Sequence, residues 1–379
     1  MPHKNAIVIG AGILGLATAR SLAVRNYKVT VFERNEKCVG ASIRNFGMIW
    51  PVGQPNGVLY ERAMRSKSIW KELCKEADLW YDEVGSLHLA HNKLELNVMQ
   101  EFVETNKNVR LVKILSKDET LQKSQAVNAT NLLGSLYSED DMIVEARVAI
   151  EKLPSYFTEK YDVEFKFNTC INFIDHPHVS SGEQSWQADE IYVCSGADFE
   201  TLYPEIFTDN NFTKCKLQMM RLIAQENNFR IGPGLCGGLS LIHYKAFEVA
   251  SSLNELKKFY AEIMPDYLKW GIHVMVAQNE TGELTIGDSH EYGLAFDPFD
   301  KQFINQLITD YLKKFAVFKD WKMIQSWNGI YAKRTSNESE FIYNPQQGVT
   351  IINGIDGAGM TLSFGLAEEV AINNVSKKE

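Results

Sequence analysis

The chain has 379 residues, a length that suits two domains of ordinary size better than one small core. Its formal net charge of -9 argues against nucleic acid as a general partner, and its 45% hydrophobic and 23% charged residues are typical of a soluble globular protein. No apolar run has membrane-spanning length, and the first predicted strand starts almost at Met1, so we expect a cytoplasmic protein without a leader or membrane anchor.

Residues 1–34 predict a strand, a glycine turn, a helix and a second strand in direct succession. The short apolar run 6–9 is typical of a buried strand, 16–25 of a helix, and 29–32 of the next strand. The turn between them has the G-x-G-x-x-G spacing of a nucleotide-binding turn, formed by Gly10, Ala11, Gly12, Ile13, Leu14 and Gly15.

Each glycine of this turn has a mechanical task. Gly10 makes the tight turn, Gly12 lets the backbone approach a pyrophosphate, and Gly15 lets the helix pack closely on the strand. The helix N-terminus then offers free N–H groups to a dianion. Glu33, followed by Arg34, stands where a carboxylate can accept both hydroxyls of an adenosine ribose. The alternative is a glycine turn that binds nothing.

The segment 39–51 mixes small residues, Arg44 and bulky apolar groups. This mixture is typical of a loop along an extended ligand, with Arg44 available to an anion, and the alternative is an ordinary surface connection. Farther along, hydrophobic periodicity predicts helices at 59–81, 94–106, 117–124 and 145–156, and strands at 86–90, 109–115, 133–137 and 163–167.

The second half of the chain predicts a return to the nucleotide site. An apolar strand at 188–194 that ends in Ser195 and Gly196 is typical of a parallel sheet with a ligand at its carboxyl end. Alternating segments then predict antiparallel strands at 216–224, 239–244, 272–278 and 283–287, with helices at 253–264 and 303–315. A strand at 349–353 leads into a second glycine-rich turn and a helix from Phe364; the alternative for this turn is a closing turn without a ligand.

Taken together, segments 1–34, 40–51 and 354–368 resemble the FAD-dependent oxidases of the D-amino-acid oxidase, glycine oxidase and sarcosine oxidase superfamily, and the likeness spans the chain. The resemblance implies a mixed α/β fold, with a Rossmann-like FAD-binding domain (1–85, 140–202 and 326–379) and a substrate-binding domain (86–139 and 203–325) whose antiparallel sheet covers the flavin.

By the same resemblance, the first turn, Glu33 and Arg34 bind the adenosine half of FAD, Ile171 lies near the adenine, and Ser195 with Gly196 flanks the nucleotide. The flavin half is implied to contact two further groups of residues: Ala41, Ser42, Arg44, Asn45, Phe46, Gly47 and Met48, and Gly357, Ala358, Gly359, Met360 and Thr361.

Residues 42–55, 287–293 and 357–363 are similar to a bacterial branch associated with phosphonate catabolism, which implies a small aminophosphonate as substrate. Two departures from the sarcosine oxidase pattern matter. The segment 329–331 contains no cysteine, so we expect non-covalent FAD, and Thr361 stands where those enzymes place a substrate-binding lysine.

Amine oxidation requires a neutral amine whose Cα–H faces flavin N5 in a dry pocket, after which the imine hydrolyses in water. We expect catalytic roles for His273, Tyr244 and Arg44, and binding of a small anionic amine by His243, Tyr244, His273, Tyr331, Lys333 and Arg334, with His290 a further candidate. For each histidine, the alternative is an ordinary structural or surface residue without a functional role.

The six cysteines form no C-x-x-C pair, so we expect no metal site, and the expected electron acceptor is O2. The alternatives are a glycine, sarcosine or D-amino-acid oxidase, or a non-catalytic FAD-binding subunit. An NAD-dependent dehydrogenase would not need the second glycine turn.

Overall fold

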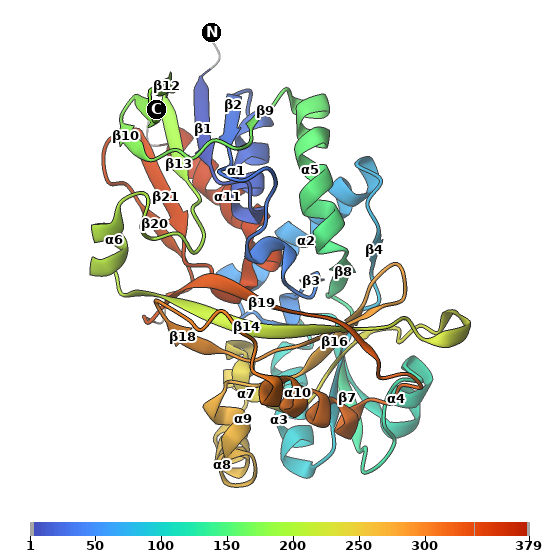
Figure 1. Cartoon of the computed structure of the whole chain (residues 1–379). Helices are drawn as coiled ribbons and strands as arrows, with labels where there is room; N and C mark the ends of the chain where they lie inside the picture. Colours follow the sequence, from blue (N-terminus) through green and yellow to red (C-terminus); the bar gives the residue numbers. More distant parts are fainter. Residues whose placement is uncertain (1–3, 337, 377–379) are drawn as a thin grey trace.

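The computed structural model describes residues 4–336 and 338–376, which form two layers built around two large β-sheets (Figure 1). One sheet is mainly parallel and lies in the upper half of the view, and the other is mainly antiparallel and lies below it. In the described part of the chain, no helix combines the length and apolar character needed to cross a membrane.

The parallel sheet carries the amino-terminal strand near its centre. Within the described residues its order is β20-β21-β13-β1-β2-β9, and only β20 runs antiparallel to its neighbour. Since β1, β2 and β13 are parallel, their carboxyl ends meet at one edge, where open α/β sheets bind ligands. The bounds are β1 Asn5–Ile9, β2 Lys28–Phe32, β9 Glu164–Lys166, β13 Glu190–Val193, β20 Phe341–Tyr343 and β21 Val349–Asn353.

The helices of this layer are α1 (Ile13–Ala23), α2 (Val58–Glu76), α5 (Ala146–Tyr161) and α11 (Gly359–Ser376). The fully buried Trp70 of α2 fixes the start of α11, because its indole Nε1 donates to the carbonyl oxygen of Met360 at 2.8 Å. Its ring also meets Phe364 edge-on, with centroids 5.1 Å apart. The first turn of α11 is therefore held by packing and by a hydrogen bond.

The second sheet runs, within the described residues, in the order β18-β14-β17-β16-β15-β5-β7-β6, and β19 pairs along the other edge of β14. Pairing is antiparallel except between β15 and β5. The strands are β5 Ser86–Ala90, β6 Val112–Ser116, β7 Gly134–Ser138, β14 Phe212–Leu222, β15 Gly234–Cys236, β16 Met275–Gln278, β17 Leu284–Gly287, β18 Glu291–Gly293 and β19 Met323–Arg334.

Helices pack on the far side of this sheet and bury its largest hydrophobic cluster. They are α3 (Lys93–Asn106), α4 (Lys117–Lys123), α7 (Leu239–His243), α8 (Leu253–Ile263), α9 (Pro265–Lys269) and α10 (Gln302–Phe315). Two small sheets complete the fold. One contains β3 (Met48–Ile49), β4 (Tyr81–Asp82) and β8 (Met142–Val144), and the other contains β10 (Phe173–Asp175), β11 (His178–Ser181) and β12 (Gln184–Gln187). The short helix α6 spans Pro204–Asp209.

Several sequence predictions of local structure differ from the structure, and the helix predicted at 145–156, for example, extends to Tyr161. Residues 239–244 form the helix α7 and its end rather than a strand, because Gly237 and Gly238 press against buried aromatic and acidic side chains and turn the chain there. The helix predicted at 59–81 ends at Glu76, and α11 begins at Gly359 rather than at Phe364. The expected domain boundaries stay a prediction.

Candidate active site

Two adjoining cavities lie between the layers. One, of about 360 Å³, opens at the carboxyl ends of β1, β2 and β13, and the other, of about 490 Å³, lies between the start of α11 and the second sheet. Ile13, Ser42, Tyr331 and Gly359 belong to the walls of both cavities. An elongated ligand can therefore extend from one cavity into the other.

The glycine turn shapes the first cavity as the sequence predicts. Gly10 has φ +105°, and a Cβ on it would lie 2.4 Å from the carbonyl oxygen of Cys194. A Cβ on Gly15 would lie 1.8 Å from the carbonyl oxygen of Gly10, which explains the close packing of helix on strand. Gly12 begins α1 without a side-chain cap, so the helix N-terminus faces the cavity.

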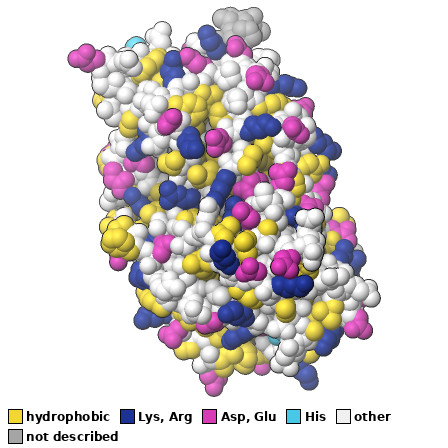
Figure 2. Space-filling view, turned by 45° about the vertical axis from the view of Figure 1, so that its right-hand side comes forward, with side chains coloured by type: hydrophobic (Ala, Val, Ile, Leu, Met, Phe, Trp, Pro, Cys, Tyr) yellow, Lys and Arg dark blue, Asp and Glu magenta, His cyan; other side chains and the backbone are white. Residues whose placement is uncertain are grey.

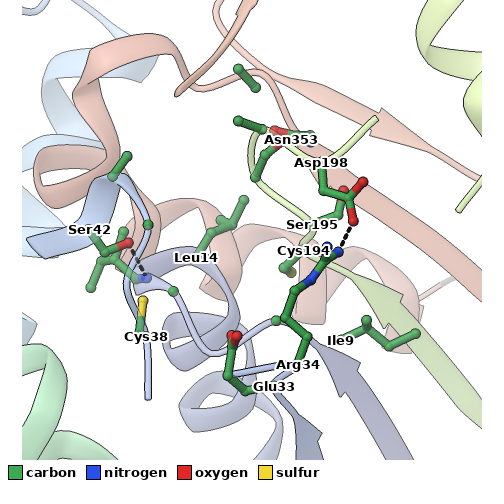
Figure 3. Close-up of a pocket in the computed structure, with 18 of the residues that line it drawn as sticks. Ile9, Leu14, Glu33, Arg34, Cys38, Ser42, Cys194, Ser195, Asp198 and Asn353 are labelled. Atoms are coloured by element: carbon green, nitrogen blue, oxygen red, sulfur yellow. Dashed lines mark hydrogen bonds and ion pairs between the residues drawn. The ribbon is translucent and has the colours of Figure 1, made fainter. Parts of the chain in front are cut away.

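Polar side chains from separate segments surround this turn (Figure 3). Glu33 Oε2 accepts the backbone N–H of Ala11 at 3.0 Å, which places the carboxylate at the end of β2. Ser42 Oγ accepts the N–H of Ile13 at 2.9 Å, and Arg34 reaches toward Asp198, with which it forms an ion pair.

The first cavity fits the adenosine and pyrophosphate half of FAD. Ser195 Oγ is buried in its wall and has no hydrogen-bond partner in the described part of the chain, so it remains available to a ligand. Ile171, 3% exposed, and Gly196 also line this cavity. Apart from the N–H of Ile13, which Ser42 accepts, the N–H groups at the start of α1 and this hydroxyl are the donors that a nucleotide phosphate and ribose require.

The expected flavin-contacting segments meet in the second cavity. Its wall contains Arg44, Asn45, Phe46, Met48 and the turn 357–361. Thr361 is 3% exposed, and its Oγ1 accepts the backbone N–H of Trp50 at 2.9 Å, so it holds the loop that precedes α2.

Some expected cofactor residues shape the backbone instead of lining a cavity: Ala11, Gly15 and Gly47 are absent from both walls. Arg44 lines the second cavity and donates through NH1 to the carbonyl oxygen of Asn328 at 3.0 Å.

The opposite wall of the second cavity carries His243, His273 and His290, which converge from different parts of the chain. His243 ends α7, His273 precedes β16, and His290 lies between β17 and β18. The ring centroids of His243 and His273 are 3.7 Å apart, and that of His290 lies 4.9 Å from His243. The sequence analysis names all three as candidates for the substrate site, but it does not predict that their rings contact one another.

Hydrogen bonds and burial determine the charge of this cluster. Nε2 of His273 lies 3.2 Å from a carboxylate oxygen of Asp288, and Nδ1 of His290 donates to the carbonyl oxygen of Gly271 at 2.9 Å. Burial lowers the pKa of His273 well below the ordinary value and that of His290 to about 4, and it raises the pKa of Asp288. His273 and His290 are therefore neutral at pH 7.

Successive side chains of the long strand β19 point to opposite faces, and this alternation separates the remaining candidate residues into two groups. Tyr331 and Lys333 face the second cavity, and Lys333 pairs with Asp356 at 3.0 Å. Arg334, expected at the substrate, lines neither cavity, because it belongs to the other face of the strand. Its guanidinium lies 5.2 Å from the Phe341 ring centroid.

Asp288, Trp50 and Tyr292 also line the second cavity and received no role from the sequence. Asp288 directly follows β17, and a polar residue at a strand end is the signal that could have identified it. Trp50 and Tyr292 carry no comparable signal. Away from the cavities, acidic and basic side chains are interspersed on the face in Figure 2.

A family model described as FAD dependent oxidoreductase matches residues 5–371. Glycine oxidase from Bacillus cereus has a similar structure, with a TM-score of 0.77, 16% sequence identity, and coverage of 99% of this chain and 96% of that chain. This similarity confirms the mixed α/β fold expected from the sequence.

Two curated relatives extend the comparison. An opine oxidase subunit from Rhizobium meliloti is 21% identical over 378 residues, which cover 93% of this chain and 91% of that protein. The tRNA 5-methylaminomethyl-2-thiouridine biosynthesis bifunctional protein of Hahella chejuensis is 23% identical over 225 residues, which cover 54% of this chain. This second match spans only 34% of the Hahella protein, about a third of its length.

Proposed function

Because the chain belongs to the FAD-dependent oxidoreductase family, we propose that it oxidises the carbon–nitrogen bond of a small amine that carries an anionic group. The observation that carries this proposal is the second cavity. The expected flavin-contacting segments form one wall, while Lys333, Tyr331 and the histidines form another. A substrate between these walls would have its reacting carbon on one side and its anionic group on the other.

FAD would be held by the turn 10–15, Glu33, Ser195 and the turn 357–361, without a covalent bond, because no cysteine stands at 329–331. When bound, FAD accepts a hydride equivalent from the carbon next to the amine nitrogen. Phe46, Met48 and Met275 contribute apolar surface to the cavity, which helps to exclude water.

The polar residues of the cavity divide into charged groups and neutral donors. Lys333 and Arg44 provide positive charge for the anionic end of the substrate. Burial raises the pKa of Tyr244 and Tyr331 well above the ordinary value, so both remain protonated and can donate hydrogen bonds.

Two substrate classes fit this arrangement. The names of two similar proteins, glycine oxidase and an opine oxidase subunit, support an amino acid or N-substituted amino acid. The resemblance of residues 42–55 to a phosphonate-associated branch supports an aminophosphonate, whose dianion would use Lys333 and the hydroxyls of Tyr244 and Tyr331. We place the amino-acid class first because the comparisons favour it.

A substrate panel against the bound flavin tests the proposal. Purified yellow protein is mixed without oxygen with glycine, sarcosine, proline, D-alanine or 2-aminoethylphosphonate, and loss of the visible flavin absorbance is followed. We expect at least one anionic amine to reduce the flavin. The Lys333→Met variant should need an amine concentration about tenfold higher or more to reach half-saturation. Flavin that dithionite reduces, but no amine of the panel, would support a non-catalytic FAD-binding subunit instead.

A further inference from the structure

We propose that His243, His273 and His290 bind one divalent transition-metal ion, with zinc as the best fit, in the wall of the second cavity. One ring nitrogen from each histidine can be chosen so that all three lie within 4.8 Å of one another. In a tetrahedral zinc site with Zn–N bonds of about 2.0–2.1 Å, ligand nitrogens lie roughly 3.3 Å apart. The rings of His243 and His273 are stacked, with centroids 3.7 Å apart, so His243, which is exposed to the cavity, has to rotate out of this stack to direct its lone pair at the ion.

The hydrogen bonds of the other ring nitrogens support a metal site. Metal-binding histidines generally donate their second ring N–H to a carboxylate or a backbone carbonyl, which fixes the tautomer. His290 does this through Nδ1 to Gly271, and His273 faces the carboxyl group of Asp288 through Nε2. These contacts leave Nε2 of His290 and Nδ1 of His273 with free lone pairs.

One of these nitrogens lacks a partner in the protein alone. Nδ1 of His273 is buried and has no hydrogen-bond partner in residues 4–336 and 338–376, while the whole side chain is 3% exposed in the structure. A buried polar atom without a partner destabilises the folded protein, because it has lost its hydrogen bonds to water. A metal ion bound at this lone pair would remove that cost.

The ligand set determines the class of ion. Three neutral imidazoles suit zinc, copper, nickel or iron rather than magnesium or calcium, which prefer oxygen ligands. Asp288, beside His273, provides a carboxylate to offset the added positive charge. Lys333 would oppose the ion, and its ion pair with Asp356, at 3.0 Å, offsets part of its charge.

Three protein ligands leave a fourth position that faces the cavity, as in catalytic zinc sites. A carboxylate or phosphonate oxygen of the substrate can occupy this position, and this part of the inference rests on the proposed function. Binding of the ion itself does not depend on the proposed function, so an experiment can refute the metal site and the proposed function separately.

Metal stoichiometry without any amine tests the site. EDTA first removes metal ions from tag-free, FAD-loaded protein, which is then equilibrated with Zn²⁺ by dialysis. Elemental mass spectrometry measures the number of zinc ions bound per chain. We expect about one zinc per chain in the wild type, and binding at least about tenfold weaker in His243→Gln and His290→Gln. His178→Gln is the matched control, because His178 is an exposed histidine on β11, outside both cavities.

Equal zinc binding by wild type, His243→Gln and His290→Gln would overturn the proposal, as would wild-type protein that retains no zinc. Bound flavin absorbance and circular dichroism show whether each variant is folded. If both variants unfold, Co²⁺ titration of the stripped wild type decides: tetrahedral Co²⁺ with nitrogen ligands gives visible bands that EDTA removes, and their absence refutes the site.

Discussion

Replacing Thr361 by valine tests whether the start of α11 holds the loop around Trp50 in place. Valine keeps the shape of the side chain but removes Oγ1, which accepts the backbone N–H of Trp50 at 2.9 Å. Thr361 is 3% exposed and Trp50 5% exposed, so water cannot readily replace the lost acceptor. A buried N–H without a partner costs about 1–3 kcal/mol.

We therefore expect Thr361→Val to lower the free energy of unfolding of the FAD-loaded protein by about 1–3 kcal/mol. Urea unfolding followed by circular dichroism measures this loss, and flavin fluorescence during heating shows whether the cofactor is released at a lower temperature. Thr361→Ser is the control, because serine retains the acceptor. A valine variant as stable as both the serine variant and the wild type would show that the hydrogen bond does not hold the loop.

Three further predictions concern the turn, acid stability and a buried ion pair. Gly15→Ala should abolish FAD retention, because its Cβ would lie 1.8 Å from a carbonyl oxygen, whereas Gly40→Ala, with no atom within 4 Å of the new Cβ, should stay yellow; equal flavin content would contradict this. Burial lowers the pKa of His88 to about 3, so the unfolded chain binds the proton first, and stability should fall as the pH drops below about 6.5, by about 2 kcal/mol at pH 5. Urea unfolding at pH 7 and pH 5 should show this loss in the wild type but a smaller one in His88→Phe, and identical losses would refute the assignment. Arg62→Met should lower the free energy of unfolding by about 3–5 kcal/mol, because Arg62 is 3% exposed and binds two glutamates. Arg65→Met, which removes an exposed ion pair, should lower it by about 1 kcal/mol or less. Similar urea midpoints for the two variants would show that the buried ion pairs of Arg62 stabilise the fold no more than the exposed one of Arg65.

Much of the fold was predictable because its signals are local. The run 6–9, the glycine spacing at 10–15 and the run 29–32 each specify their own backbone, and the structure has β1, α1 and β2 there. Asn26 also adopts the positive φ, 62°, that asparagine tolerates in a tight turn.

The errors arose where distant contacts decide the structure. The run 239–244 is too short for its periodicity to separate strand from helix, and contacts with Glu95, Tyr260 and Tyr311 fix the turn before it. Strand β19 is largely exposed over its first half, and it is defined by its register with β14. Such pairing cannot be read from the strand alone.

The two cavities also differ in how much of each could be predicted from local sequence. One contiguous motif supplies part of the wall of the first cavity, where Gly10, Gly12, Ile13 and Leu14 lie as the glycine spacing predicts. The histidine wall depends on one helix end and two strand-connecting segments, which the second sheet brings together. Arg334 could not be excluded beforehand, because its orientation depends on which face of β19 meets the cavity.

The position of β1 in its sheet has a consequence for biosynthesis. Strand β1 is synthesised before its partner β13, and β13 pairs in turn with β21 at Val349–Asn353. The nascent chain therefore has the glycine turn long before it has both walls of the cavity. Until β13 is synthesised, one edge of β1 has unpaired backbone groups, which are able to pair with other chains.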